Sequence, residues 1–374
     1  MLKDHIKIFF LAIILLLARY QSDYEIIGLT ALIAFLALFF ASGKTEEKLF
    51  YFLFFQFFEY FELIDGIPVS IPYLIICIFI LFYFIKDGKQ IDIFIILLIF
   101  ISIYSYIISS IYPAKLFLTY FMIYVACNGL NFLKLDCDSK NNIIFKKIEL
   151  FYIFLITFWI LEAIIHFVLP NFKTNIVVGN DYRPIGFFSE PTYFIFLIAT
   201  TAIILSRVHK INILIALSLS IYSQSRIFTP ILYFAAVKKN IILFFFSLTL
   251  IIVCFLFFIG DDSYFARFID ITDSIRGGLL KNALSSLSIE SVLFPPNDNE
   301  LHKTGIFYFQ LVNVFGGLTA SIMFLYLTIH LISKAGYVGS MLILISFFHP
   351  IQYSAISLTA LLLGYHLKNV YSQK

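Results

Sequence analysis

Long apolar runs follow one another along almost the whole chain, and this pattern restricts the folds that it can adopt. Of the 374 residues, 61% are apolar and 13% are charged, whereas soluble domains carry about 45–50% apolar and about 25% charged residues. In a bilayer the backbone N–H and C=O groups find no water, so an apolar run crosses it as a helix that satisfies them internally. The sequence therefore predicts an all-α, polytopic integral membrane helical bundle, with residues 1–374 in a single membrane domain.

The runs predict about 12–14 spans, some of them short or arranged as hairpins. Several are shorter than the ~20 residues that cross a bilayer. The pair 211–222 and 227–237, and the pair 337–348 and 354–367, are therefore expected to be half-crossing hairpins or strongly tilted helices. The expected spans are 6–19, 24–41, 49–64, 67–85, 91–110, 114–133, 146–169, 191–206, 211–222, 227–237, 241–259, 306–332, 337–348 and 354–367.

The placement of lysine predicts the orientation of the spans. Short cytoplasmic loops of membrane proteins carry an excess of Lys and Arg. With the N-terminus inside, 17 of the 26 basic residues fall at inner ends and inner loops, so both termini are expected in the cytoplasm. Two large polar loops, 170–190 and 260–305, are then expected on the outer side. The net charge of +3 is small, and we expect no nucleic-acid partner.

Arginine is distributed differently from lysine, because five of the six arginines are expected on the outer side. A guanidinium group presents a planar fork of donors that suits phosphate or carboxylate, and it keeps its charge. One interpretation is an anionic partner outside the membrane; the other is that each arginine pairs with a nearby acid, such as Asp181 or Asp273. The five are Arg19, Arg183, Arg226, Arg267 and Arg276.

Acidic and histidine side chains within the predicted spans are few, and four of them are candidates for a polar site: Glu59, Glu62, Glu162 and His166. Such groups within a membrane pair with one another or line a wet cavity. One interpretation is that all four reach the interface or bond to one another. The other is that Glu162 and His166, which lie one helical turn apart, form the floor of an outward-facing cavity beneath the 170–190 loop.

The 170–190 loop contains local signals of its own. Arg183 precedes Pro184, which moves the arginine out of the helical region of backbone conformation. Glu190 precedes Pro191, and proline suits the first turn of a helix, whose positive end favours an ionised carboxylate. These features indicate either a capped helix start or a polar site that includes one. The chain has no P-loop, no Gly-rich dinucleotide turn and no His-Glu-x-x-His motif, so we expect no metal ion and no cofactor.

Three short stretches resemble a family of membrane enzymes. Residues Arg183 to Thr192 read Arg-Pro-Ile-Gly-Phe-Phe-Ser-Glu-Pro-Thr, which is similar to the R-x-x-G-x-x-x-E-P pattern in outer loops of the Wzy O-antigen polymerases. Residues Ser223 to Arg226, Ser-Gln-Ser-Arg, resemble the short turn that follows between two spans in that family. Asp273 to Arg276 resembles the arginine-bearing opening of the second large loop, and the resemblance covers about residues 145–365.

The resemblance implies a GT-C-like glycosyltransferase in the bacterial inner membrane, with its active site and both large loops on the periplasmic side. The implied activity is the polymerisation of O-antigen repeat units by inverting, metal-independent glycosyl transfer. Both the donor glycan and the acceptor glycan are carried on undecaprenyl diphosphate. Further implied partners are the membrane lipid and a protein that regulates chain length.

The implied site consists of substrate-binding residues and a general base. Preorganised arginines stabilise the charge that develops on a leaving diphosphate, which removes the need for a metal ion. The general base is expected at Glu190, with His302 and then Asp298 as the next candidates. The residues expected to bind the diphosphate and its glycan are Tyr182, Arg183, Arg226, Arg267 and Arg276.

Two alternatives are an O-antigen ligase and a flippase or other transporter of lipid-linked oligosaccharides. Ligases carry His-Asn just before a late span, whereas here Gly305 stands near that place and His302 is displaced by about a turn. A transporter requires polar side chains through the thickness of the membrane. The predicted spans 67–85, 91–110 and 241–259 offer little beyond Ser, Tyr and Cys, which favours the enzyme.

Overall fold

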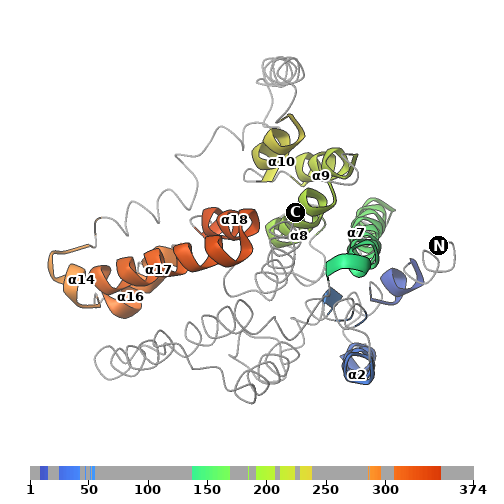
Figure 1. Ribbon diagram of the computed structural model, residues 1–374, viewed down its shortest axis with the longest axis horizontal. Helices are drawn as coiled ribbons and strands as arrows, with labels where there is room; N and C mark the ends of the chain where they lie inside the picture. The colour runs from blue at the N-terminus through green and yellow to red at the C-terminus, as the bar shows by residue number, and fades with distance from the viewer. Residues whose placement is uncertain are drawn as a thin grey trace.

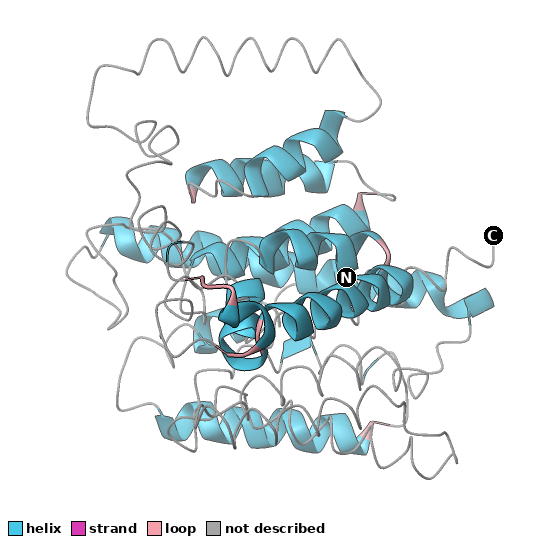
Figure 2. Cartoon of the chain, turned by 90° about the vertical axis from the view of Figure 1, so that its left-hand side faces the viewer, coloured by secondary structure: helices cyan, strands magenta, loops and turns pink. Residues whose placement is uncertain are grey.

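The computed structural model describes part of the chain, and all regular secondary structure in that part is α-helical (Figure 2). No strand occurs in the described residues, which confirms the all-α class. The described residues are 9–15, 25–42, 47, 51, 53–54, 137–168, 184, 191–206, 211–223, 228–237, 285, 287–295 and 307–346.

Most helix bounds follow the apolar runs within one or two residues. α9 has the bounds predicted for 211–222, and α10 begins one residue after the predicted 227. α7 begins at residue 137 instead of 146, because its first turns are polar and a hydropathy pattern does not detect them. The helices are α2 (Glu25–Ala41), α7 (Cys137–Val168), α8 (Pro191–Leu205), α9 (Ile211–Tyr222), α10 (Phe228–Val237), α14 (Glu290–Leu293), α16 (Phe307–Phe315), α17 (Gly317–Ala335) and α18 (Tyr337–Ser346).

One helix of the described part is long and apolar enough to cross a membrane. It is the stretch Phe145–Ile165 of α7, with a mean hydropathy of 2.1 over its most apolar part. The apolar helices Phe194–Leu205, Ile211–Tyr222 and Gly317–Ser333 are shorter. The predicted spans 67–85, 91–110, 114–133, 241–259 and 354–367 lie outside the described residues.

The buried face of α7 organises the helices around it. Its buried side chains recur every three or four residues, which places them on one face of a helix. The opposite face is also apolar, since Ile160, Ile164 and Phe167 are exposed. The buried face comprises Ile148, Phe151, Tyr152, Phe154, Leu155, Phe158, Trp159 and Glu162.

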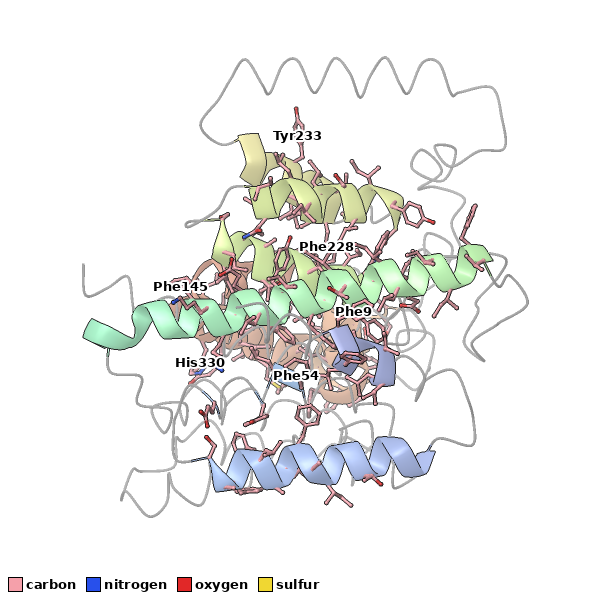
Figure 3. The ribbon with its side chains drawn as sticks, turned by 90° about the vertical axis from the view of Figure 1, so that its right-hand side faces the viewer. Phe9, Phe54, Phe145, Phe228, Tyr233 and His330 are labelled. Carbon is pink, nitrogen blue, oxygen red and sulfur yellow. The ribbon has the colours of Figure 1, made fainter. Side chains whose placement is uncertain are left out.

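Phe54 connects α2 to this face of α7, and Figure 3 shows it between the two helices. Its ring stacks on Phe35 of α2 at a centroid distance of 5.6 Å. The same ring meets Phe151 and Phe154 edge-on at 5.4 and 4.8 Å. Aromatic pairs in this range of distance add about 0.5–1.5 kcal/mol each beyond the area that they bury. The Phe54 side chain is fully buried, so these ring contacts lie in the interior of the protein.

Helices α7, α8, α9 and α10 pack together as one group, to the right of α14, α16, α17 and α18 in Figure 1. α8 contacts all three of the others, and α9 also contacts α10. Tyr152 of α7 donates from its hydroxyl to the carbonyl oxygen of Asn212, at the start of α9, at 2.7 Å. This hydrogen bond fixes the register of α7 against α9.

The prediction of one continuous span over 306–332 is wrong, because the chain turns back on itself at Gly316. Gly316 has φ 78° and ψ 161°, a conformation that is essentially restricted to glycine. The hydroxyls of Tyr308 and Ser321 lie 2.9 Å apart, and the Tyr308 ring meets Phe324 at 5.8 Å. α16 and α17 are therefore an antiparallel hairpin. Hydropathy does not detect the break, because both arms of the hairpin are apolar.

Part of the predicted second outer loop is docked on this hairpin. Within 260–305, the structure describes residue 285 and residues 287–295, which include the short helix α14. A Cβ atom on Gly316 would lie 2.9 Å from the backbone oxygen of Leu293, and one on Gly317 would lie 3.3 Å from the Cα atom of Val292. The backbone of α14 thus contacts the two glycines directly, and this part of the predicted loop has a defined position against the hairpin.

Substitution of Gly316 and of Gly317 tests this contact with α14. Gly316→Ala is expected to destabilise the protein by about 1–3 kcal/mol, because alanine is strained at this φ and ψ and its Cβ would overlap the Leu293 carbonyl. Gly317→Ala is the matched control. Gly317 is helical, so alanine gains helix propensity of up to about 1 kcal/mol, and its Cβ would make a milder contact, with the Cα atom of Val292. Thermal unfolding of the purified variants measures both. Equal melting temperatures for the two variants would contradict the described turn.

Candidate functional site

The site residues predicted from the sequence all lie outside the described residues, so their roles stay predictions. Pro184, directly after Arg183, is described and is buried. The helices that flank these residues are described, and they show where the connecting segments begin and end. The residues in question are Tyr182, Arg183, Glu190, Arg226, Arg267, Arg276, Asp298 and His302.

Two of the connections that carry predicted site residues are bordered by helix ends on the same side of the α7–α10 group. Phe158, ten residues before the end of α7 at Val168, meets Phe194 at the start of α8 at 6.1 Å. Phe196 of α8 in turn meets Phe228, the first residue of α10, at 5.6 Å. The start of α8, the end of α9 and the start of α10 therefore lie on the same side of the group, and α7 continues to Val168, about 15 Å along its axis beyond Phe158.

A hydrogen bond ties α7 to the end of α9 at this same place. The indole Nε1 of Trp159 donates to the Ser223 hydroxyl at 3.3 Å. Next to it, the Trp159 ring meets Tyr222 edge-on at 5.1 Å. Ser223 is only 2% exposed, and Trp159 is 6% exposed, so the pair is enclosed by protein. Ser223 is also the first residue of the Ser-Gln-Ser-Arg stretch, whose beginning is thereby held against α7.

The other side of that stretch is held by a second hydrogen bond. The hydroxyls of Ser220 in α9 and Thr229 in α10 lie 2.9 Å apart. Ser220 is fully buried, where an unsatisfied hydroxyl would be unfavourable. The two helices therefore leave residues 224–227 as a short connection between fixed ends.

Glu162 lies one turn beyond Trp159, on the buried face of α7, and has no exposed surface. This burial shows that the side chain of Glu162 is enclosed within the helix group. The side chain of His166 lies outside the described residues, as do Glu59 and Glu62. A buried carboxyl group requires hydrogen-bond donors or a cation to be stable. Glu162 is therefore an enclosed acidic group of α7, one turn beyond the Trp159–Ser223 bond and six residues before the end of the helix.

Sequence reasoning identified Glu162 but missed Trp159, Ser220 and Thr229. A pattern was available for the first of them: Tyr152, Trp159 and Glu162 are spaced by seven and three residues, which places polar-tipped side chains on one helix face. Trp159 is also the single tryptophan of the chain. Nothing in the sequence pairs Ser220 with Thr229, since that contact depends on how α9 and α10 are joined.

Among the described residues, no group of three or more His, Cys, Asp or Glu side chains could hold a metal ion. The comparisons add no relative, because no protein-family model matches the chain and neither a curated protein nor a solved structure is similar to it.

The Trp159–Ser223 bond leads to a prediction about stability. Ser223→Ala leaves the enclosed indole N–H without its acceptor, and the expected loss of unfolding free energy is about 1–3 kcal/mol. Ser218→Ala serves as the control, because Ser218 is an exposed residue of α9 that bonds only to a carbonyl of its own helix. Thermal unfolding, followed by the fluorescence of the single tryptophan, measures both variants. Equal stability of the two variants would contradict the bond.

Proposed function

We propose that the chain is an O-antigen polymerase: a polytopic inner-membrane glycosyltransferase that joins undecaprenyl-diphosphate-linked oligosaccharide repeat units at the periplasmic face. The observation that carries the proposal is the position of the helix ends that border the two motif-bearing stretches. The stretch Arg183–Thr192 and the stretch Ser223–Arg226 resemble polymerase motifs. The starts of α8 and α10 and the end of α9, which border these stretches, lie on one side of the α7–α10 group, and this arrangement supports the proposal.

The surface of α17 supports the membrane location. Ala320, Met323, Leu327 and Leu331 are buried on one face of this helix. The opposite face is apolar as well, and its residues recur at helical spacing. A helix that is apolar on its outer face as well as its inner face fits the core of a large protein or a membrane, and contiguous exposed apolar surface marks an interface with lipid or protein. The exposed residues are Leu318, Ile322, Leu325, Ile329 and Ile332.

The proposed reaction is an inverting glycosyl transfer. A hydroxyl of the acceptor repeat unit attacks the anomeric carbon of the donor glycan, and the bond from that carbon to the diphosphate oxygen breaks. The acceptor hydroxyl gives its proton to a general base, for which Glu190 is the first candidate. Undecaprenyl diphosphate leaves with the bonding electron pair. Arginines held at the diphosphate stabilise charge that is larger in the transition state than in the ground state.

Arginine also explains how the transfer proceeds without a metal ion in this proposal. Arg183, Arg226 and Arg276 supply the positive charge, with Arg267 and Tyr182 as further contacts to the substrate. Each guanidinium offers five N–H donors in a fixed plane, and it stays protonated at any physiological pH. The remaining proposed partners are the surrounding lipid and a protein that regulates chain length.

Substitution of the first loop tests the site. Arg183→Ala and Glu190→Ala are each expected to lower the rate by about 10²–10³-fold, by analogy with the loss of other preorganised groups. Arg183→Lys is also expected to impair function, because lysine keeps the charge and loses the bidentate fork. The readout is the chain-length ladder of surface polysaccharide in a complemented deletion strain, with Lys173→Ala in the same loop as the control. An unchanged ladder for both alanine variants would exclude this site.

The deletion strain also separates the polymerase from its alternatives. Loss of a polymerase leaves a single repeat unit on the lipid core, loss of a ligase leaves unsubstituted core, and loss of a flippase leaves no repeat unit exported. An in vitro assay with the purified protein and lipid-linked repeat units then tests the transfer directly.

Reporter fusions test the proposed orientation. A reporter that is active only in the periplasm is expected to be active after Asn180, in the first outer loop, and inactive after Lys239, which follows α10. A reporter that is active only in the cytoplasm is expected to give the reverse result. The opposite pattern with both reporters would place the arginine-bearing loops in the cytoplasm, away from lipid-linked glycans that await polymerisation.

A further inference from the structure

The segment 287–294, which contains α14, has its apolar side chains outside and a serine inside. Ser291 is the one buried residue of the segment, at 3% exposure, whereas Ile289 is 91% exposed. In water the opposite arrangement is favoured, because removing apolar surface from water gains about 25 cal/mol per Å². This inversion indicates that the outer side of the segment meets an apolar medium or an apolar partner. The exposed apolar residues are Leu287, Ile289, Val292, Leu293 and Phe294.

Polar groups of the segment are satisfied within it. The Ser291 hydroxyl donates to the carbonyl oxygen of Ser288 at 2.6 Å, and the Ser291 N–H donates to the Ser288 hydroxyl at 3.2 Å. The N–H of Phe294 donates to the carbonyl oxygen of Glu290 at 2.9 Å. Polar groups without partners keep a segment out of lipid, since each costs several kcal/mol there. These hydrogen bonds lower that cost for residues 288–294.

The apolar surface of the segment continues onto α17. A Cβ atom on Gly317, the first residue of α17, would lie 3.3 Å from the Cα atom of Val292. The next residue, Leu318, is exposed and begins the apolar stripe of α17, which runs for about 21 Å along the helix axis. Figure 1 shows α14 at the end of α17 that is remote from α18. The segment therefore extends one end of this stripe, which comprises Leu318, Ile322, Leu325, Ile329 and Ile332.

Charged residues indicate the depth and the side of this end. Glu290 is exposed in the middle of the segment, and a carboxylate within hydrocarbon is strongly unfavourable. The segment therefore fits the boundary between headgroups and acyl chains, where its carboxylate can reach water. Lys334, near the other end of α17, is among the lysines that predict the cytoplasmic side. In the proposed orientation, α14 is then at the periplasmic surface.

We propose that residues 287–294 are an interfacial membrane anchor, whose exposed apolar side chains enter the outer leaflet and hold this part of the second outer loop at the level of the headgroups. The apolar face of such an element lies about 5–10 Å into the boundary of the leaflet. The proposal rests on the membrane location and the orientation of the proposed function. A protein partner is disfavoured, because a stable interface takes about 20–30 residues on each side, and this segment presents five apolar residues.

Tryptophan fluorescence in lipid nanodiscs tests the anchor. Ile289→Trp adds an indole at an exposed position, and the enclosed Trp159 of the wild-type protein supplies the baseline that is subtracted. Discs that hold one copy of the full-length chain exclude contact with a second copy. We expect lipids with bromine near the headgroups to quench most of the added emission, and lipids with bromine near the ends of the acyl chains to quench less of it. Stronger quenching by the deep bromine would overturn the interfacial depth.

Leu325→Trp is the matched control, since Leu325 is an exposed residue of the α17 stripe about 12 Å along the axis from Gly317. Its emission is expected to be quenched more by the deep bromine than by the shallow one. Quenching at residue 325 without quenching at residue 289 would overturn the anchor while the membrane location stands. If neither position is quenched, the anchor and the membrane location on which the proposed function depends are both overturned.

A further variant tests the native side chains, because an indole by itself prefers the membrane interface. Leu293→Ser and Phe294→Ser are added together to Ile289→Trp. Both side chains are exposed, and both residues approach Gly316 through their backbone, so the position of α14 on the hairpin is kept. The anchor predicts weaker quenching at residue 289 in this variant and a greater accessibility of its indole to aqueous iodide. Unchanged quenching would show that the added indole alone enters the lipid, and it would overturn the proposal.

Discussion

The one-sided burial of α7 is the feature on which the described part of the structure depends. Its buried face receives Phe54 beside α2, Phe194 of α8 and the end of α9, so three separate stretches of chain are placed by one helix. In the membrane location that we propose, apolar helices gain no hydrophobic free energy by coming together, and their association depends on close packing and interhelical hydrogen bonds. α7 supplies both, through its interlocked aromatic rings and through the polar tips of Tyr152 and Trp159.

The two helix groups use different means of close packing. Around α7 the contacts are made by large rings, and polar pairs fix the register of the helices. In the group from α14 to α18 the contacts are made by glycine: Gly316 and Gly317 admit the backbone of α14, and Gly339 admits the backbone of α17 at Leu331. Backbone contact through small residues is a usual means of packing helices in membranes. In the proposed enzyme, these glycine contacts hold residues 287–295 of the second outer loop against the membrane domain.

Helix type and most helix bounds could be predicted from the sequence, because they depend on local hydropathy and on nearby proline and glycine. α9 ends before Ser223, and α8 begins at Pro191, where proline suits a first turn. The hairpin at Gly316 could not be predicted in this way. Its two arms are apolar, and a pattern that is apolar on both sides of a glycine fits one long helix as well as two that fold back. The short helix α14 was predicted to be part of a loop. Its position could not be read from the local sequence, because the residues that it contacts follow it by more than twenty positions.

The sequence by itself determined that the described part of the chain is helical, where the apolar segments lie and which arginine and acidic residues fall outside them. These properties follow from the residue types and their spacing along the chain. The tertiary structure decided that the starts of α8 and α10 and the end of α9 lie on one side of the α7–α10 group, and that Glu162 is enclosed one turn from the Trp159–Ser223 bond. These features join residues about sixty positions apart. They depend on which helix faces meet, and local hydropathy carries no information about that choice.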